Sequence, residues 1–188
     1  MLLETEIVDY AENKNDIQHW VKLKGEFRYE KIIDFLKSKD IECTWGNVTN
    51  YIRYDKRILI NSFKYIVFLE EFYKSLICEY KKVEQNNLII YDFKKSLKEY
   101  LSLGNKANYD GIDLEMLKTS KKAVVDFRNT IAHNKILLGH IFIDKSLEEI
   151  LDTFIKILPA SYRQGFITDI NDCARDLIGN YWKIVLSI

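Results

Sequence analysis

The feature that most constrains the fold is the stretch from residue 55 to residue 82, which contains neither glycine nor proline. Apolar residues recur along it at intervals of three and four, the period of one face of an α-helix. The positions expected to face the core are Leu59, Phe63, Ile66, Val67, Phe72 or Tyr73, and Ile77. The sequence therefore predicts a long helix here, roughly 40 Å in length at about 1.5 Å per residue.

The rest of the chain also has the composition of a helical protein. Only seven glycines and one proline occur in 188 residues, and 47% of the residues are hydrophobic. We predict an all-α helical bundle that forms a single domain over residues 1–188, with residues 1–24 as an N-terminal arm or helix. Further helices are predicted over residues 26–39, 91–103, 113–133 and 146–158, and from Pro159 onward. Residues 135–143 are predicted as a loop or a short extended connection.

Charge and cysteine content limit the classes of function. Lys plus Arg and Asp plus Glu each number 28, so the molecule has no net charge to attract nucleic acid from a distance. Any RNA binding must use local cations, and the neutral surface permits self-association. The three widely spaced cysteines are expected to be reduced core residues, and we predict no metal site and no cofactor. Without a signal peptide or a stretch of about 18 apolar residues, the protein is expected in the cytoplasm, away from membranes.

An arginine, an asparagine and a histidine gather near the end of the helix predicted over residues 113–133. The segment reads Phe127-Arg128-Asn129-Thr130-Ile131-Ala132-His133-Asn134. At about 100° per residue, Asn129 and His133 fall opposite the side expected to face the core. That core side is formed by Leu117, Val124, Phe127 and Ile131.

Arg128 falls about 140° around the helix from His133, so the two side chains do not meet on a regular helix. Three arrangements remain open. The arginine bends toward the histidine, the helix ends before His133, or two copies of the helix cross and pair the residues between chains.

The spacing of Arg128, Asn129 and His133 resembles the Arg-Asn-x-x-x-His motif of the HEPN superfamily. These helical proteins include many ribonuclease toxins, abortive-infection proteins and the RNA-cleaving parts of type VI CRISPR effectors. The resemblance implies a HEPN-type bundle with the motif late in a long helix. It also implies a homodimer in which two motifs share one cleft, and we predict a C2 homodimer as the active form.

A second segment, Tyr54-Asp55-Lys56-Arg57-Ile58-Leu59, is similar to the start of a helix in the Abi family of phage-exclusion proteins. In that family a Tyr/Phe-Asp-Arg-x-Leu segment begins the helix beneath the catalytic one. Lys56 stands where arginine is commoner. The resemblance implies an abortive-infection or toxin-type effector that acts in antiviral defence.

The motif residues suit cleavage of RNA by attack of a ribose 2′-OH on the adjacent phosphorus, without a metal. His133 would move the proton, because histidine titrates near neutral pH. Arg128 would hold the phosphate through paired hydrogen bonds, and Asn129 would orient His133 or the substrate. The products would carry 2′,3′-cyclic phosphate ends. The expected partner is RNA, which local cations would guide to the site; the candidates are Lys121, Lys122, Lys135, Arg53 and Arg57.

Each residue also has a structural interpretation. Arg128 can form a salt bridge, and His133 can interact with the dipole at the end of the helix. One alternative is therefore a catalytically silent HEPN module for dimerisation or interaction. Another is the toxin of a toxin-antitoxin pair. In the branch neutralised by a nucleotidyltransferase antitoxin a tyrosine commonly sits two positions after the histidine, whereas this chain has Lys135 there. Some antitoxin or regulatory partner is expected, but no residue identifies it.

Overall fold

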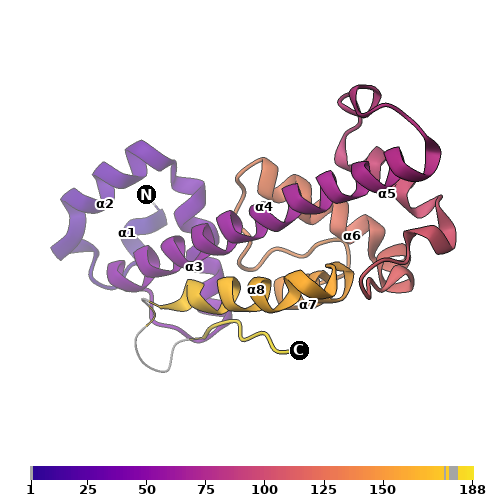
Figure 1. The fold of residues 1–188 in the computed structure, drawn as a ribbon. Helices are drawn as coiled ribbons and strands as arrows, with labels where there is room; N and C mark the ends of the chain where they lie inside the picture. Colours follow the sequence, from indigo (N-terminus) through magenta and orange to yellow (C-terminus); the bar gives the residue numbers. More distant parts are fainter. Residues whose placement is uncertain (1, 176, 178–181) are drawn as a thin grey trace.

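The chain folds into α-helices joined by short turns, in a computed structural model that describes residues 2–175, 177 and 182–188 (Figure 1). The α-helices are α1 (Leu2–Glu6), α2 (Tyr10–Lys24), α3 (Glu26–Ser38), α4 (Trp45–Lys81), α5 (Phe93–Leu101), α6 (Leu114–Ala132), α7 (Leu147–Ile157) and α8 (Ala160–Asn171). Three short 3-10 turns are η1 (Gln85–Leu88), η2 (Gly104–Ala107) and η3 (Asp172–Ala174). Among the described residues, extended backbone pairs only in one isolated bridge between Phe142 and Lys145. The predicted all-α class is confirmed.

The long helix α4 begins ten residues earlier than the predicted stretch and contains 37 residues. Its N-cap is Thr44, whose hydroxyl accepts a hydrogen bond from the backbone N–H of Asn47 at 3.2 Å. Gly46 therefore lies in the first turn of α4 and does not separate two helices. The helix ends at Lys81, and its C-cap, Lys82, adopts a left-handed conformation with φ 54°.

The other helices pack around α4. Figure 1 shows α1, α2 and α3 gathered at its N-terminal end, α5 at its C-terminal end, and α6, α7 and α8 along its length. Aromatic side chains fill the interfaces between them. Tyr73 of α4 stacks on Tyr100 of α5 with ring centroids 4.3 Å apart, and Phe127 of α6 meets Phe154 of α7 edge-on at 5.1 Å. These contacts hold α5 against α4 and α7 against α6.

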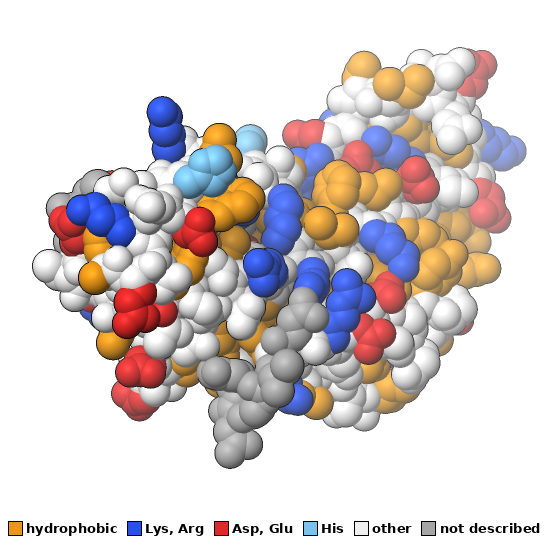
Figure 2. Space-filling view, turned by 90° about the vertical axis from the view of Figure 1, so that its left-hand side faces the viewer, with side chains coloured by type: hydrophobic (Ala, Val, Ile, Leu, Met, Phe, Trp, Pro, Cys, Tyr) orange, Lys and Arg blue, Asp and Glu red, His pale blue; other side chains and the backbone are white. Residues whose placement is uncertain are grey.

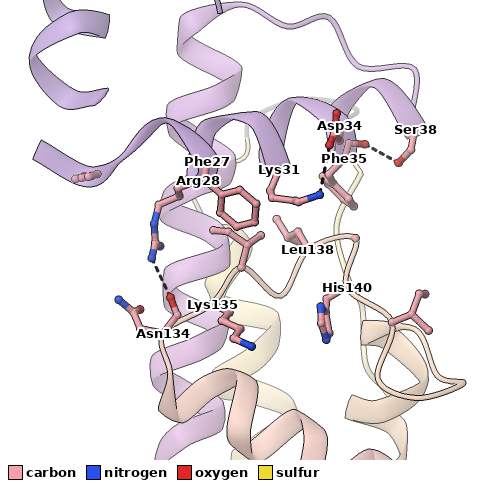
Figure 3. A pocket seen from close by; sticks show the side chains of 14 residues that line it. Phe27, Arg28, Lys31, Asp34, Phe35, Ser38, Asn134, Lys135, Leu138 and His140 are labelled. Atoms are coloured by element: carbon pink, nitrogen blue, oxygen red, sulfur yellow. Dashed lines mark hydrogen bonds and ion pairs between the residues drawn. The ribbon is translucent and has the colours of Figure 1, made fainter. Parts of the chain in front are cut away.

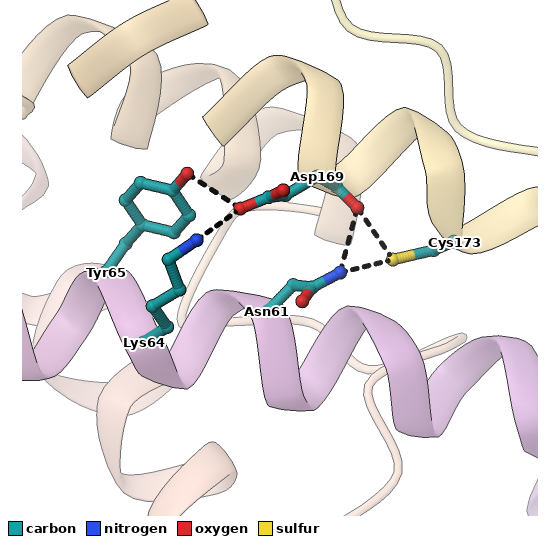
Figure 4. A network of polar contacts seen from close by, with 5 residues as sticks. All are labelled: Asn61, Lys64, Tyr65, Asp169 and Cys173. Carbon is teal, nitrogen blue, oxygen red and sulfur yellow. Dashed lines mark hydrogen bonds and ion pairs between the residues drawn. The ribbon is translucent and has the colours of Figure 1, made fainter. Parts of the chain in front are cut away.

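A polar network attaches α8 to α4 (Figure 4). The Asp169 carboxylate accepts hydrogen bonds from Lys64 Nζ at 2.7 Å and Tyr65 Oη at 2.8 Å. Asn61 donates to the backbone carbonyl of Asp169 at 2.9 Å. Burial raises the pKa of Asp169, but the hydrogen bonds from Lys64 and Tyr65 outweigh it, so the pKa lies below its usual range. The network fixes α8 along the side of α4.

Capping residues mark the starts of the shorter helices. The Asp113 carboxylate accepts from the backbone N–H of Met116 at 2.8 Å at the start of α6. Ser146 and Glu149 form a reciprocal capping box at the start of α7. Asp92 caps α5, which begins two residues later than predicted.

Two apolar residues assigned to the core are exposed instead: Phe63 and Val67 are 47% and 38% exposed on α4. Helical spacing alone does not distinguish a face that packs in the core from an apolar face that stays exposed. The prediction that Phe63 and Val67 face the core was therefore wrong. The other predicted core positions on α4, including Leu59 and Ile66, are buried. The described part of the segment 1–24 forms the helices α1 and α2, the second of its two predicted forms.

Candidate functional site

The motif lies where α6 ends. The last helical residue is Ala132, and His133 is the C-cap, with φ −89° and ψ 8°. Asn134 then turns the chain in a left-handed conformation with φ 53°. Its N–H donates to the carbonyl of Ile131, and the N–H of Lys135 donates to the carbonyl of Thr130. These bonds form a Schellman motif, which satisfies carbonyls left unpaired at the end of the helix.

The predicted inner face of α6 is confirmed. Leu117, Val124, Phe127 and Ile131 are buried, each exposed by 3% or less. Asn129 and His133 are exposed on the outer side. Of the three arrangements considered for Arg128 and His133, the helix indeed ends before His133.

Arg128 leans toward α4. Its side chain is 30% exposed, with Nη2 3.9 Å from Oε2 of Glu70 and Nη1 3.4 Å from Oδ1 of Asn129. Glu70 also accepts a hydrogen bond from Lys74 Nζ at 2.8 Å. At 3.9 Å the charges of Arg128 and Glu70 attract but share no hydrogen bond. The guanidinium group is therefore oriented by Asn129 and Glu70 while part of it stays accessible.

His133 is open to solvent. Within the described part of the chain its imidazole makes no hydrogen bond or ion pair, and Arg128 does not reach it. Only the backbone joins His133 to the rest of the motif, through its N–H, which donates to the carbonyl of Asn129 at 2.9 Å. One copy of the chain thus presents the three residues within the last turn of α6 without assembling them into a hydrogen-bonded set.

The residue after His133 joins three elements. The backbone carbonyl of Asn134 accepts from Arg28 Nη2 of α3 at 2.9 Å (Figure 3). Its side-chain Oδ1 accepts from Lys56 Nζ of α4 at 2.5 Å. Sequence reasoning missed Arg28 and gave Asn134 no site role, because the contacts span 106 and 78 residues. Asn134, which carries no charge, therefore binds both Arg28 and Lys56 at the end of the motif.

A buried carboxylate anchors the loop that follows. Asp55 is fully buried, and its Oδ1 accepts from the backbone N–H groups of Leu137 and Leu138 at 2.8 and 2.9 Å. Its Oδ2 has no hydrogen-bond partner among the described residues. Burial raises the pKa of Asp55 to about 6, against the lowering effect of both N–H groups and of the nearby Arg28 and Lys56. Asp55 is a positioning residue, because it fixes the loop after His133 to α4.

Two neighbouring hollows flank Asn134. One, of about 700 Å³, lies between α3 and residues 134–141, and the other, of about 590 Å³, lies between α2, α3 and α4. Both are lined by Lys24, Arg28 and Asn134. Figure 2 views the molecule from the end where α1, α2 and α3 lie, and shows Lys and Arg side chains gathered across the middle of this face.

The structure separates the predicted RNA-binding residues into two groups. Arg53 and Arg57 line the smaller hollow, and Lys135 lines the larger one. Lys121 and Lys122 lie about two helical turns before Arg128 on α6 and line neither hollow. Arg53, Arg57 and Lys135 thus line the hollows that Arg28 also lines, whereas Lys121 and Lys122 lie elsewhere.

Comparison with known proteins gives no assignment: no family model, curated protein or solved structure matches the chain. Among the described residues, no group of three His, Cys, Asp or Glu side chains is placed to hold a metal ion. None of the described helices is both long and apolar enough to cross a membrane.

Proposed function

We propose that this protein is a metal-independent endoribonuclease of the HEPN type, with Arg128, Asn129 and His133 as its catalytic residues. One observation carries the proposal. His133 is an exposed cap at the end of α6, and the residue after it lies in two cation-lined hollows. An accessible histidine beside positive charge is suited to proton transfer at a phosphodiester.

The reaction needs one base and one acid. His133 takes the proton from a ribose 2′-OH, the 2′ oxygen bonds to the adjacent phosphorus, and the bond from phosphorus to the 5′ oxygen breaks. A second imidazole returns a proton to that oxygen, which leaves a 2′,3′-cyclic phosphate and a 5′-hydroxyl end. Arg128 stabilises the added negative charge on the phosphate by paired hydrogen bonds. Asn129, which already holds Arg128 at 3.4 Å, orients it.

A second copy of the chain would supply the second imidazole. An exposed apolar strip on α4, formed by Ile60, Phe63 and Val67, supports a C2 homodimer. These residues share one face of α4 with Lys56 and Glu70, which contact Asn134 and Arg128 at the end of α6. The strip therefore runs beside the motif, and a copy docked there would bring its own motif close.

The biological role follows from the resemblance of the motif and of residues 54–59. It is that of an abortive-infection or toxin-type effector in antiviral defence, acting in the cytoplasm. Since an unregulated ribonuclease harms its host, a regulatory partner or antitoxin belongs to this proposal.

The contact between Arg128 and Glu70 favours a second candidate. Arg128 is partly buried and paired, as expected if the motif now serves only to hold α6 against α4. The protein would then be a dimerisation or interaction module without turnover.

The decisive experiment is cleavage of a labelled mixed-sequence RNA in EDTA by the wild type, Arg128→Ala and His133→Ala. A Lys94→Glu variant is the matched control, because Lys94 is exposed on α5 at the other end of α4. The proposal expects cleavage by the wild type and the control, with cyclic phosphate ends, and loss of cleavage in both motif variants. DNA of the same sequence should stay intact.

Two results would contradict the proposal. Cleavage that survives both motif substitutions assigns the activity elsewhere. A folded wild-type dimer that never cleaves RNA favours the interaction module.

A further inference from the structure

We propose that the two hollows around Asn134 form one binding track for single-stranded RNA, which leads the strand past His133. This inference deepens the proposed function and rests on it for the identity of the cleaved strand. The binding track itself is defined by charge and shape.

Positive charge converges in the smaller hollow from three helices. Lys24 of α2, Arg28 of α3 and Lys56 of α4 line it together with Arg53 and Arg57. None of the described residues that line it is acidic. Arg28 and Lys56 are both held by oxygens of Asn134, which is neutral, so their positions are fixed without a paired carboxylate within 4 Å in the part of the chain that the structure describes. Fixed cations facing one space are suited to successive phosphates of a nucleic acid.

The negative charge of the buried Asp55 offsets the positive charge of the smaller hollow only in part. Its carboxylate lies close enough to Arg28 and Lys56 for both to lower its pKa, and the carboxylate itself accepts from Leu137 and Leu138. One buried acid does not balance the charges of Lys24, Arg28, Arg53 and Lys56.

The larger hollow adds an apolar surface. The ring of Phe27, 67% exposed, points from α3 toward the loop that carries Leu138, with Phe35 further along the same helix (Figure 3). Lys135 and His140 lie on the opposite side. The one acidic residue that lines this hollow among those described, Asp34, pairs with Lys31 at 3.8 Å. An exposed aromatic ring among cations is the arrangement on which unpaired bases stack.

The order of residues connects the track with the motif. Asn134 and Lys135 line the larger hollow and directly follow His133 in the chain. A strand with a base on Phe27 and phosphates on Arg28 and Lys56 therefore passes beside His133. A double helix presents no unstacked base to Phe27, and an acidic peptide presents no base at all. Single-stranded nucleic acid uses both the cations and the ring.

The test measures binding apart from cleavage. The protein carries His133→Ala, EDTA is present, and the probe is a fluorescein-labelled single-stranded RNA about 12 nucleotides long. Fluorescence anisotropy is measured over a range of salt concentrations. The substitutions Lys56→Glu, Lys135→Glu and Phe27→Ala are added one at a time, with Lys94→Glu as the control. Lys135 is exposed and its side chain makes no hydrogen bond or ion pair with the described residues, so its variant is informative even if Lys56→Glu disturbs the loop.

The expected results are specific. Three or four phosphate contacts give a slope of log affinity against log salt of about −2 to −3 for a single strand. Each lysine variant should bind about tenfold more weakly or worse, with a slope smaller by about 0.7. Phe27→Ala should weaken binding about fivefold or more without changing the slope. Single-stranded DNA should bind as the RNA does, and duplex RNA more weakly.

The two proposals fail in different ways. If all three variants bind as the control does, the track is refuted, and a wild type that cleaves RNA keeps the proposed function. If the variants lose binding but the wild type never cleaves, the track stands and the ribonuclease is refuted. If duplex RNA or a polyglutamate peptide binds as tightly as the single strand, the assignment to single strands is overturned.

Discussion

Replacing Asp55 by asparagine should remove a pH dependence of stability that is built into the loop after His133. In the folded protein the pKa of Asp55 lies at about 6, above its ordinary value of 3.8. A raised pKa means that the fold prefers the protonated form. The resulting stabilisation is complete below about pH 3.8 and is lost as the pH rises through about 6. The full difference is about 3 kcal/mol, and the part between pH 7 and pH 5 is about 1.3 kcal/mol.

The measurement is the free energy of unfolding in denaturant for the wild type and Asp55→Asn between pH 5 and pH 7. Asparagine keeps an oxygen that accepts from Leu137 and Leu138 but does not titrate in this range. Subtracting the two curves cancels the titration of all other groups. On acidification to pH 5 the wild type should gain about 1.3 kcal/mol over the variant, or about 3 to 5 °C in unfolding temperature for a chain of this length.

The control is Asp144→Asn, at an exposed carboxylate that makes no side-chain hydrogen bond within the described residues. Its curve should run parallel to that of the wild type. A difference between the wild type and Asp55→Asn that stays constant from pH 5 to pH 7, or changes in the opposite direction, refutes the reasoning from burial.

Phe127→Ala removes a fully buried ring and should lower the unfolding free energy by about 3 to 5 kcal/mol in a denaturant titration, while Phe27→Ala should change it by less than about 0.5. Equal effects would contradict the burial of Phe127. Thr44→Ala should cost about 1 kcal/mol in the same titration, because it removes the hydroxyl that caps α4; no loss would mean that the cap is unimportant. Phe63→Glu places a charge on the exposed strip of α4 and should give a monomer in sedimentation velocity, with an unchanged unfolding temperature. A dimer that persists would place the interface elsewhere.

Local patterns were sufficient to predict much of the fold. The inner face of α6 follows from residues spaced by three, four and seven, and the caps Asp113 and Ser146 follow from side chains that bond the next turn. These features depend on neighbours a few residues apart. The exposure of Phe63 depends instead on whether another helix packs over it, and the spacing of apolar residues along α4 does not show this.

The site was predictable only in its local part. The end of the motif helix and the exposure of Asn129 and His133 depend on neighbouring positions. Asn134 meets α3 and α4 through contacts with residues about 80 to 110 positions away, which no local pattern specifies. The sequence signal that could have indicated the site is Asp55, the one carboxylate on the largely apolar buried face of α4 among the described residues.

Asn134 carries three requirements at a single position, and few residues meet them together. Its left-handed backbone favours glycine, asparagine and aspartate. The bond from Lys56 needs a side-chain oxygen, which removes glycine, and aspartate would neutralise the lysine that it holds. Asparagine is what remains. A screen of all twenty amino acids at this position should therefore retain the turn in several variants, but only asparagine should keep a stable turn together with a Lys56 that is both held in place and uncompensated.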